Sequence, residues 1–390
     1  MPHSMRNLLR IVLIFIIVPV LASSLSGPWR QTSAAAGPEV KYGVPVKAGP
    51  MDSILLKDYS PASSLVVPQT RVPKARYPVI DVHTHSSMNK MKTPADVEAW
   101  VRRMDEVGVQ LSVVFTEAVG GEFDRQAKLF LTRYPDRFQV YCGLDTTDIE
   151  APDYADRAVR ELERCYRQGA RGVGEITDKG WGLQASEQSA LPRAKRLRLD
   201  DPRLDKFWQM CAELTLPINV HIADHPSCWQ PLGPHQERTP DFQGFNLYHK
   251  DVPSYEELLA TRDRLLARHP QTRFIFCHFS NQGNDLAALA KAMDRFPNLR
   301  LDISARDYEL GRQPRAARQF LTRYKDRVFF GTDMGWERPM YEGWWRLLET
   351  ADEYLPGRIW WRYYALELPD DVLKSLYRDN ALRWLNWTKP

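Results

Sequence analysis

Two histidines, His83 and His85, stand two residues apart. His83 lies in the apolar run 78–84, and His85 follows that run directly. Side chains two apart on a β-strand share a face, so this pair can bind one ion together. Imidazole nitrogen is a preferred ligand of borderline divalent cations such as zinc. An HxH pair alone does not specify a metal site, because a strand end can be polar by chance.

Residues of ligand type recur at the ends of other short apolar runs. These are Glu175 after GVG, His221 after PINV, His278 after FIFC and Asp333 after FFGT. Each has a simple structural explanation, such as a satisfied core histidine or a carboxylate that caps a helix or pairs with an arginine. Buried together without a cation, they would be costly to desolvate. We therefore predict that they converge on a divalent metal.

The segments around these residues alternate between short apolar runs and amphipathic stretches. The predicted strands are 78–84, 111–117, 138–144, 170–176, 217–223, 273–279, 299–305 and 328–333. The predicted helices are 94–107, 123–134, 155–168, 203–215, 254–268, 285–295, 314–325 and 370–385. This alternation indicates parallel βαβ units, and eight of each predict an α/β fold of the (β/α)₈ TIM-barrel type. An open doubly wound sheet is the alternative, but no Gly-rich dinucleotide turn follows the first strand. In a barrel, strand ends share one mouth.

The start of the chain has the pattern of an export signal. Arg6 and Arg10 precede an apolar run, residues 11–22, and small residues follow it. This run is shorter than the roughly 20 residues of a membrane span. We expect a signal peptide over residues 1–23, an arm or linker rich in Pro, Ser, Ala and Gly over 24–76, and the barrel domain over 77–390. The protein would then be periplasmic or secreted, without stable membrane insertion; an uncleaved N-terminal anchor is the alternative.

Composition and cysteine spacing narrow the class of protein. Of 390 residues, 43% are hydrophobic, and the net charge of +4 comes from interspersed charges. No basic stripe indicates nucleic-acid binding. The five cysteines include no CxxC pair, so no zinc ribbon is expected. Most should be buried thiols, and one disulfide stays possible in an exported protein.

The sequence resembles the amidohydrolase superfamily, in its amidohydrolase-related branch, over about residues 77–386. The resemblance rests on Asp81-Val82-His83-Thr84-His85, on the runs that carry His221 and His278, on Gly331-Thr332-Asp333 and on Asn380-Ala381 near the end. It implies a metal held by His83, His85, His221 and Asp333, with His278 as a second-metal ligand or a catalytic acid/base. No strand has an obvious lysine for carbamylation, and the fourth strand offers Glu175 instead. This resembles the members of the branch in which a glutamate at this place bridges two metal ions. We expect zinc, with one ion favoured and two possible.

The expected activity is hydrolysis of a C–O or C–N bond in a small, carboxylate-bearing substrate by metal-activated water. Asp333 and His278 are the predicted catalytic residues, and Arg306, His225 and Trp181 are predicted to contact the substrate. Non-oxidative decarboxylation of an unsaturated or aromatic acid is one alternative, and a binding protein without catalysis is another. A homo-oligomer is possible.

Overall fold

The computed structural model describes residues 62–387, except 234, 239–243, 358–360 and 386, and short stretches between 40 and 58. The chain divides into two units, Met1–Leu65 and Val66–Pro390. In the first, β1 (Val40–Lys41) pairs antiparallel with β2 (Val44–Pro45). The expected signal segment, residues 1–23, lies outside the described residues. In the part of the chain that is described, no helix combines the length and apolar character needed to cross a bilayer.

The second unit is built on eight parallel strands. They are β3 (Val79–His85), β4 (Val109–Phe115), β5 (Phe138–Tyr141), β6 (Val173–Asp178), β7 (Pro217–Ile222), β8 (Arg273–Phe276), β9 (Arg300–Asp302) and β10 (Val328–Phe329). Ladder pairing gives one sheet in the order β3-β4-β5 and a second in the order β10-β9-β8-β7-β6.

Two short seams join these sheets into a ring. At one seam, a parallel bridge links Cys142, next to β5, with Val173 of β6. At the other, the Val82 N–H donates to the Phe330 carbonyl at 3.0 Å, and the Asp333 N–H donates to the His83 carbonyl at 3.0 Å. The predicted TIM barrel is therefore confirmed, with its first and last strands side by side.

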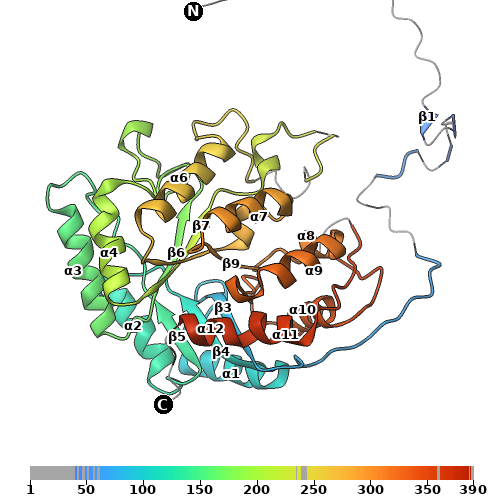
Figure 1. The fold of residues 1–390 in the computed structure, drawn as a ribbon, viewed down its shortest axis with the longest axis horizontal. Coiled ribbons are helices and arrows are strands. Elements are labelled where there is room, and N and C mark those ends of the chain that lie inside the picture. The colour runs from blue at the N-terminus through green and yellow to red at the C-terminus, as the bar shows by residue number, and fades with distance from the viewer. Residues whose placement is uncertain are drawn as a thin grey trace, which may run out of the picture. The chain divides into compact units, whose positions relative to one another are not determined.

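Helices surround the strands of this unit (Figure 1). They are α1 (Pro94–Val107), α2 (Gly120–Leu131), α3 (Tyr154–Arg167), α4 (Asp205–Glu213), α6 (Tyr255–Arg268), α7 (Leu286–Arg295), α8 (Asp307–Arg312), α9 (Pro314–Arg323), α10 (Arg338–Glu349), and a final helical stretch of α11 (Asp370–Lys374), a π-turn (Ser375–Asp379) and α12 (Asn380–Trp384). The start of α1 shows how local sequence sets such bounds. Thr93 and Asp96 form a reciprocal capping box, and Gly108 ends the helix at a φ of 93°.

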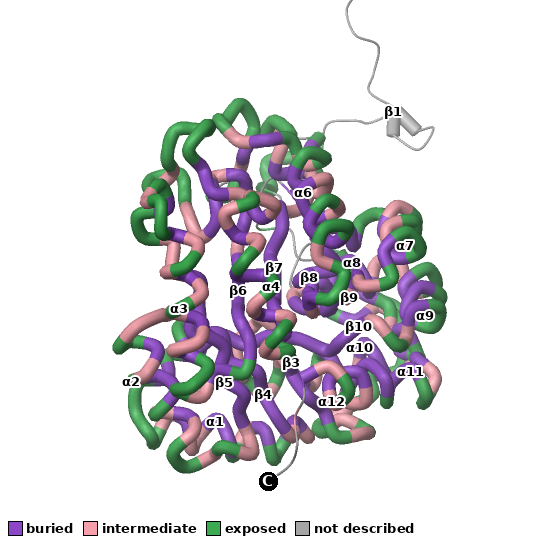
Figure 2. Tube along the Cα trace, turned by 60° about the vertical axis from the view of Figure 1, so that its left-hand side comes forward, coloured by how far each residue is buried: buried purple, intermediate pink, exposed green. Residues whose placement is uncertain are grey.

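Buried residues lie along the barrel strands, and exposed residues lie mostly on the outer helices and loops (Figure 2). Side chains from both sheets, among them Ile80, Leu111, Tyr141 and Ile275, form one cluster with Ala381 of the final helical stretch. A larger apolar cluster lies between strands and helices. All five cysteines are free and buried, and the described residues contain no disulfide.

Most predicted elements match those observed, and the differences concern strand ends and two helices. The sixth and eighth strands end earlier than predicted, at Phe276 and Phe329. His278 instead opens a 3₁₀ turn with a φ of 58°, and Asp333 has a φ of 50°. Both side chains are therefore presented from turns that follow the ladder. Helices α8 and α10 were not predicted.

Candidate metal centre and active site

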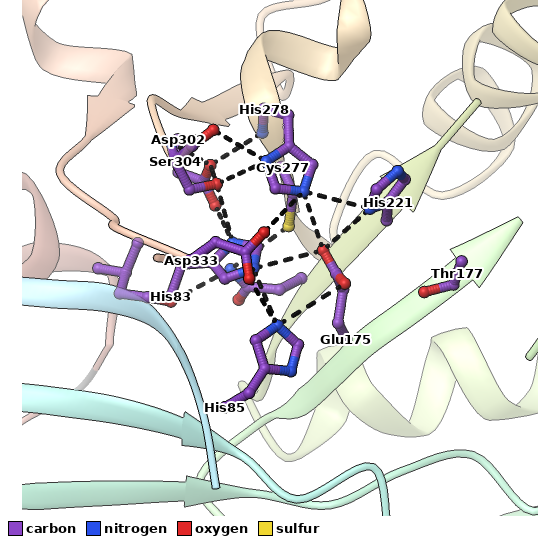
Figure 3. Close-up of polar contacts among 12 residues, drawn as sticks. His83, His85, Glu175, Thr177, His221, Cys277, His278, Asp302, Ser304 and Asp333 are labelled. Atoms are coloured by element: carbon purple, nitrogen blue, oxygen red, sulfur yellow. Dashed lines mark hydrogen bonds and ion pairs between the residues drawn. The ribbon is translucent and has the colours of Figure 1, made fainter. Parts of the chain in front are cut away.

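Six predicted residues meet at the carboxyl ends of the strands (Figure 3). They are His83 and His85 from β3, Glu175 from β6, His221 from β7, His278 from the turn after β8 and Asp333 from the turn after β10. The structure thus brings together all the predicted metal ligands and both predicted catalytic residues.

One half of the cluster consists of His83, His85 and Asp333. The two Nε2 atoms of the histidines lie 3.3 Å apart. Asp333 Oδ1 lies 3.1 Å from His85 Nε2 and 3.6 Å from His83 Nε2. Three potential ligand atoms therefore face one small volume.

The other half consists of His221 and His278, with Glu175 between the halves. His221 Nδ1 lies 3.2 Å from His278 Nε2, and Glu175 Oε1 lies 3.4 Å from each. The same Oε1 is 3.4 Å from His83 Nε2, and Glu175 Oε2 is 3.9 Å from His85 Nε2. Glu175 thus lies within 3.9 Å of all four histidines, whereas Asp333 lies within that distance of His83, His85 and His278, with Oδ2 3.7 Å from His278 Nε2.

Partners outside the cluster fix which ring nitrogen of each histidine carries a proton. Each imidazole has its second nitrogen beside an oxygen that can only accept a hydrogen bond. These contacts are His83 Nδ1 to Asp302 Oδ2 (2.9 Å), His85 Nδ1 to Glu117 Oε1 (2.7 Å), His221 Nε2 to Asp224 Oδ1 (3.1 Å) and His278 Nδ1 to the Ser304 carbonyl (2.9 Å). In the neutral rings, the nitrogens that face the cluster are therefore unprotonated.

This arrangement fits divalent cations. Two unprotonated nitrogens at 3.2 or 3.3 Å repel each other unless a positive charge lies between them. Ligands about 2.0–2.1 Å from a tetrahedral zinc ion are separated by about 3.3–3.4 Å. In addition, Glu175 Oε1 is buried without a hydrogen-bond partner, which is costly for an anionic oxygen. Donor types, spacing and the unpartnered oxygen thus agree.

The charges of the cluster reinforce one another. Burial alone would raise the pKa of Asp333, but His83 and His85 lower it well below the usual carboxyl range. Burial alone would lower the pKa of His85, but hydrogen bonds with Asp333 and Glu117 raise it to about 9. Without a cation, protons therefore compensate the carboxylates, and a cation must displace them.

A cavity of about 200 Å³ opens above the cluster. It is lined by Lys179, His221, Asp224, His225, Cys228, Arg238, Phe245, His278, Ala305, Arg306, Tyr308 and Asp333. Of the two cluster carboxylates, Asp333 lines this cavity and Glu175 does not. Asp333 is therefore the carboxylate within reach of a bound molecule.

The three predicted substrate contacts have different surroundings. Arg306 lines the cavity and donates to Asn281 Oδ1 and to the Ala305 carbonyl. His225 also lines it, with Nε2 3.4 Å from Glu309 Oε1. Trp181 lies apart from them, on a second cavity of about 410 Å³ that it shares with Arg196.

Sequence reasoning did not identify the residues that orient the histidines or the other cavity cations. Asp302 ends β9 and Glu117 follows β4 by two residues, so the strand-end argument could have found both. Asp224, Lys179 and Arg238 lie on connections, where the sequence gives no comparable signal.

The fold and the cluster define a TIM-barrel protein with a candidate metal centre at its strand ends. A sequence model of the family described as Amidohydrolase matches residues 80–387, and the chain belongs to this family. Proteins of this family are generally enzymes. No curated protein sequence matches the chain.

Solved structures share the fold at low sequence identity. One is 2,6-dihydroxybenzoate decarboxylase from Rhizobium, which is 17% identical, with 80% of this chain and 99% of that chain covered and a TM-score of 0.50. Another is 4-oxalomesaconate hydratase from Rhodopseudomonas palustris, which is 14% identical, with 79% and 95% covered and a TM-score of 0.50. At such identities the likeness concerns the fold alone.

Proposed function

We propose that this protein is a metal-dependent hydrolase of a small, carboxylate-bearing substrate, with two cation positions that share Glu175. The observation that supports it most is the presence of two pairs of facing imidazoles, one pair on each side of the buried Glu175 carboxylate. The sequence favours a single ion, but the two facing nitrogen pairs, each with nitrogens at ligand spacing and within 3.9 Å of Glu175, offer two cation positions. The geometry therefore supports the two-ion alternative.

The residues divide between the two positions by distance. His83, His85 and Asp333 would hold one cation, His221 and His278 the other, and Glu175 would contribute an oxygen to each. Zinc suits such mixed nitrogen and carboxylate sites. When bound, the cations would polarise a carbonyl group and lower the pKa of water toward neutrality.

Asp333 is suited to move the proton of the attacking water. Its carboxylate lines the cavity, where one of its oxygens can accept a proton from a bound water. The same oxygen can then donate that proton to the leaving group, in general acid–base catalysis.

His278 is better suited to bind a cation than to act as an acid. Its Nδ1–H donates to the Ser304 carbonyl, so Nε2 is left unprotonated toward His221 and Glu175. Burial lowers the pKa of His278, which keeps the ring neutral. Of its two predicted roles, the geometry supports that of a ligand.

Arg306 would orient the substrate by pairing with its carboxylate. The guanidinium is held in place by Asn281 and lies 3.5 Å from Glu309 Oε2. His225 would border the bound molecule as a neutral group, because burial and the guanidinium of Arg238 lower its pKa to about 3. Trp181 has no part in this proposal, because it lies on another cavity.

A substrate screen in ¹⁸O-labelled water tests the reaction type. The zinc-loaded protein would be offered lactones, esters and amides that carry a carboxylate, together with aromatic and unsaturated acids. Hydrolysis places one ¹⁸O atom in the acid product, and Asp333→Asn should slow it by about 10²- to 10⁴-fold. Release of CO₂ without labelled acid would favour decarboxylation, and no turnover with tight binding would favour a binding protein.

A further inference from the structure

His221 differs from the other three cluster histidines in how it is held. It faces the cluster with Nδ1 and donates Nε2–H to Asp224, whereas the others face it with Nε2. Asp224 Oδ1 is therefore the atom that sets the orientation of this ring. Asp224 in turn contacts Lys179, whose Nζ lies 3.1 Å from the same Oδ1.

The fold places Lys179 and Asp224 beside each other. β6 and β7 are parallel neighbours with Asp178 opposite Ile222, and the Ala223 N–H donates to the Asp178 carbonyl at 2.9 Å. The chain therefore leaves both strands at the same height. Lys179 follows β6 by one residue, and Asp224 follows β7 by two.

The turn that carries Lys179 is fixed on both sides. The buried carboxylate of Asp178 accepts from the Gly180 N–H at 3.0 Å and from Arg198 Nε at 2.9 Å. Gly180 has a φ of 100°, which suits glycine in this tight turn. Lys179 is thus presented by a well-supported backbone, with its side chain 31% exposed at the cavity.

We propose that Lys179 and Asp224 are positioning residues for His221. Lys179 holds the Asp224 carboxylate and balances its charge, and Asp224 holds the His221 ring so that Nδ1 points at His278 and Glu175. This inference rests on the proposed function, since it assigns the pair to the cation position formed by His221, His278 and Glu175. Partners outside a metal site commonly change affinity by 10- to 100-fold.

Glu117 provides a matched control in the same molecule. It holds His85 Nδ1 at 2.7 Å and so serves the other cation position. Lys195 lies in the same connection as Lys179 and provides a control for charge. It pairs with the exposed Glu150 at 2.9 Å. Neither residue contacts His221 in the part of the chain that the structure describes.

Competition titrations of Zn²⁺ against a chromophoric chelator test the assignment. Lys179→Met and Asp224→Ala should lower the affinity for one equivalent of zinc by about 10- to 100-fold and leave the affinity for the other unchanged. Glu117→Gln should lower the affinity for the other equivalent, and Lys195→Met should change neither affinity. Lys179→Arg should keep most of the wild-type affinity that Lys179→Met loses. Lys179 is partly exposed, so its variants should fold even if Asp224→Ala does not.

Two results would separate this inference from the proposed function. Wild-type affinity for both equivalents in Lys179→Met and Asp224→Ala would overturn the positioning role, as would equal weakening of both. A wild-type protein that binds one equivalent would contradict the two-cation site instead. The positioning role would then require that Lys179→Met weaken that single equivalent while Lys195→Met leaves it unchanged.

Discussion

Protons and cations compete for the imidazole nitrogens around Glu175 and Asp333. Four imidazoles face these two carboxylates, and each ring donates its outer N–H to an oxygen that cannot donate in return. Such outer contacts fix the tautomer and make the inner nitrogen more basic. At the scale of single residues, the inner nitrogens and the two carboxylates therefore form a site that favours positive charge. Two predictions concern residues of this site.

The first prediction concerns the proton acceptor. Asp333→Asn should lower kcat by about 10²- to 10⁴-fold, because the side chain keeps its shape but loses its charge and basic oxygen. Zinc content should fall little, since the histidines remain. Asp326→Asn, an exposed carboxylate, serves as the control. Wild-type kcat in Asp333→Asn would exclude Asp333 from proton transfer.

A second prediction concerns pH. The pKa of His85 in the metal-free site is about 9, so this ring is protonated at pH 7 and must release its proton when zinc binds. Zinc affinity should therefore rise with pH up to about 9, by about tenfold per unit for this proton. Calorimetry in buffers of different ionisation enthalpy would measure the release. Affinity that is constant between pH 6 and 8 would contradict this assignment.

At the scale of elements, the seam between β3 and β10 places Asp333 next to the histidines of β3. Gly331 stands where an added Cβ would come within 2.8 Å of His83 Cβ. Gly331→Ala should destabilise the fold by about 1–3 kcal/mol and weaken zinc binding, because the seam must open. Gly343 in α10 has open space around its Cα, so Gly343→Ala should stabilise by about 0.5–1 kcal/mol. Thermal unfolding compares the two, and equal stability would contradict the close packing at Gly331.

The connection between β7 and α6 contributes a pH-dependent element. Burial and the guanidinium groups of Arg238 and Arg306 lower the pKa of His225 to about 3, whereas an exposed histidine has a pKa of 6.5. The unfolded chain thus takes up this proton first, so the contribution of His225 to stability is present above about pH 6.5 and is lost as the pH falls toward 3.

Comparison with His225→Gln isolates this contribution. Between pH 7.5 and pH 5, the wild type should lose about 2 kcal/mol more unfolding free energy than the variant. Chemical denaturation at both pH values measures the difference. Parallel losses in the two proteins would show that His225 titrates as an exposed group.

At the scale of the whole molecule, the order of strands and the clustering of histidine and carboxylate side chains at their ends were predictable from the sequence. Alternating apolar runs located every barrel strand to within a few residues, since buried parallel strands have a strong apolar signal. The bounds of α1 were predicted correctly, because its cap residues are local. Helix α10 was missed, because it begins beyond the turn after Asp333 and its aromatic residues, such as Trp344 and Trp345, were not recognised as a buried face.

Other features depend on contacts between distant segments and could not be read from spacing. Trp181 and His225 both lie on loops after strands, yet only His225 lines the cavity above the cluster. Loop direction is set by tertiary packing, such as that of Arg196 against Asp251. The contact of His221 with His278 beside Glu175 likewise appears only when the barrel is assembled.

The central claim is that Glu175 is shared by two cations, and metal content tests it most directly. Elemental analysis of the zinc-loaded protein should give about two equivalents per chain, and Glu175→Gln should retain about one, because bridging needs both carboxylate oxygens charged. The retained ion should be the one held by His83, His85 and Asp333, because this position keeps three ligands and the other keeps only His221 and His278. A wild type that holds one equivalent, unchanged in Glu175→Gln, would contradict the shared carboxylate and the account built on it.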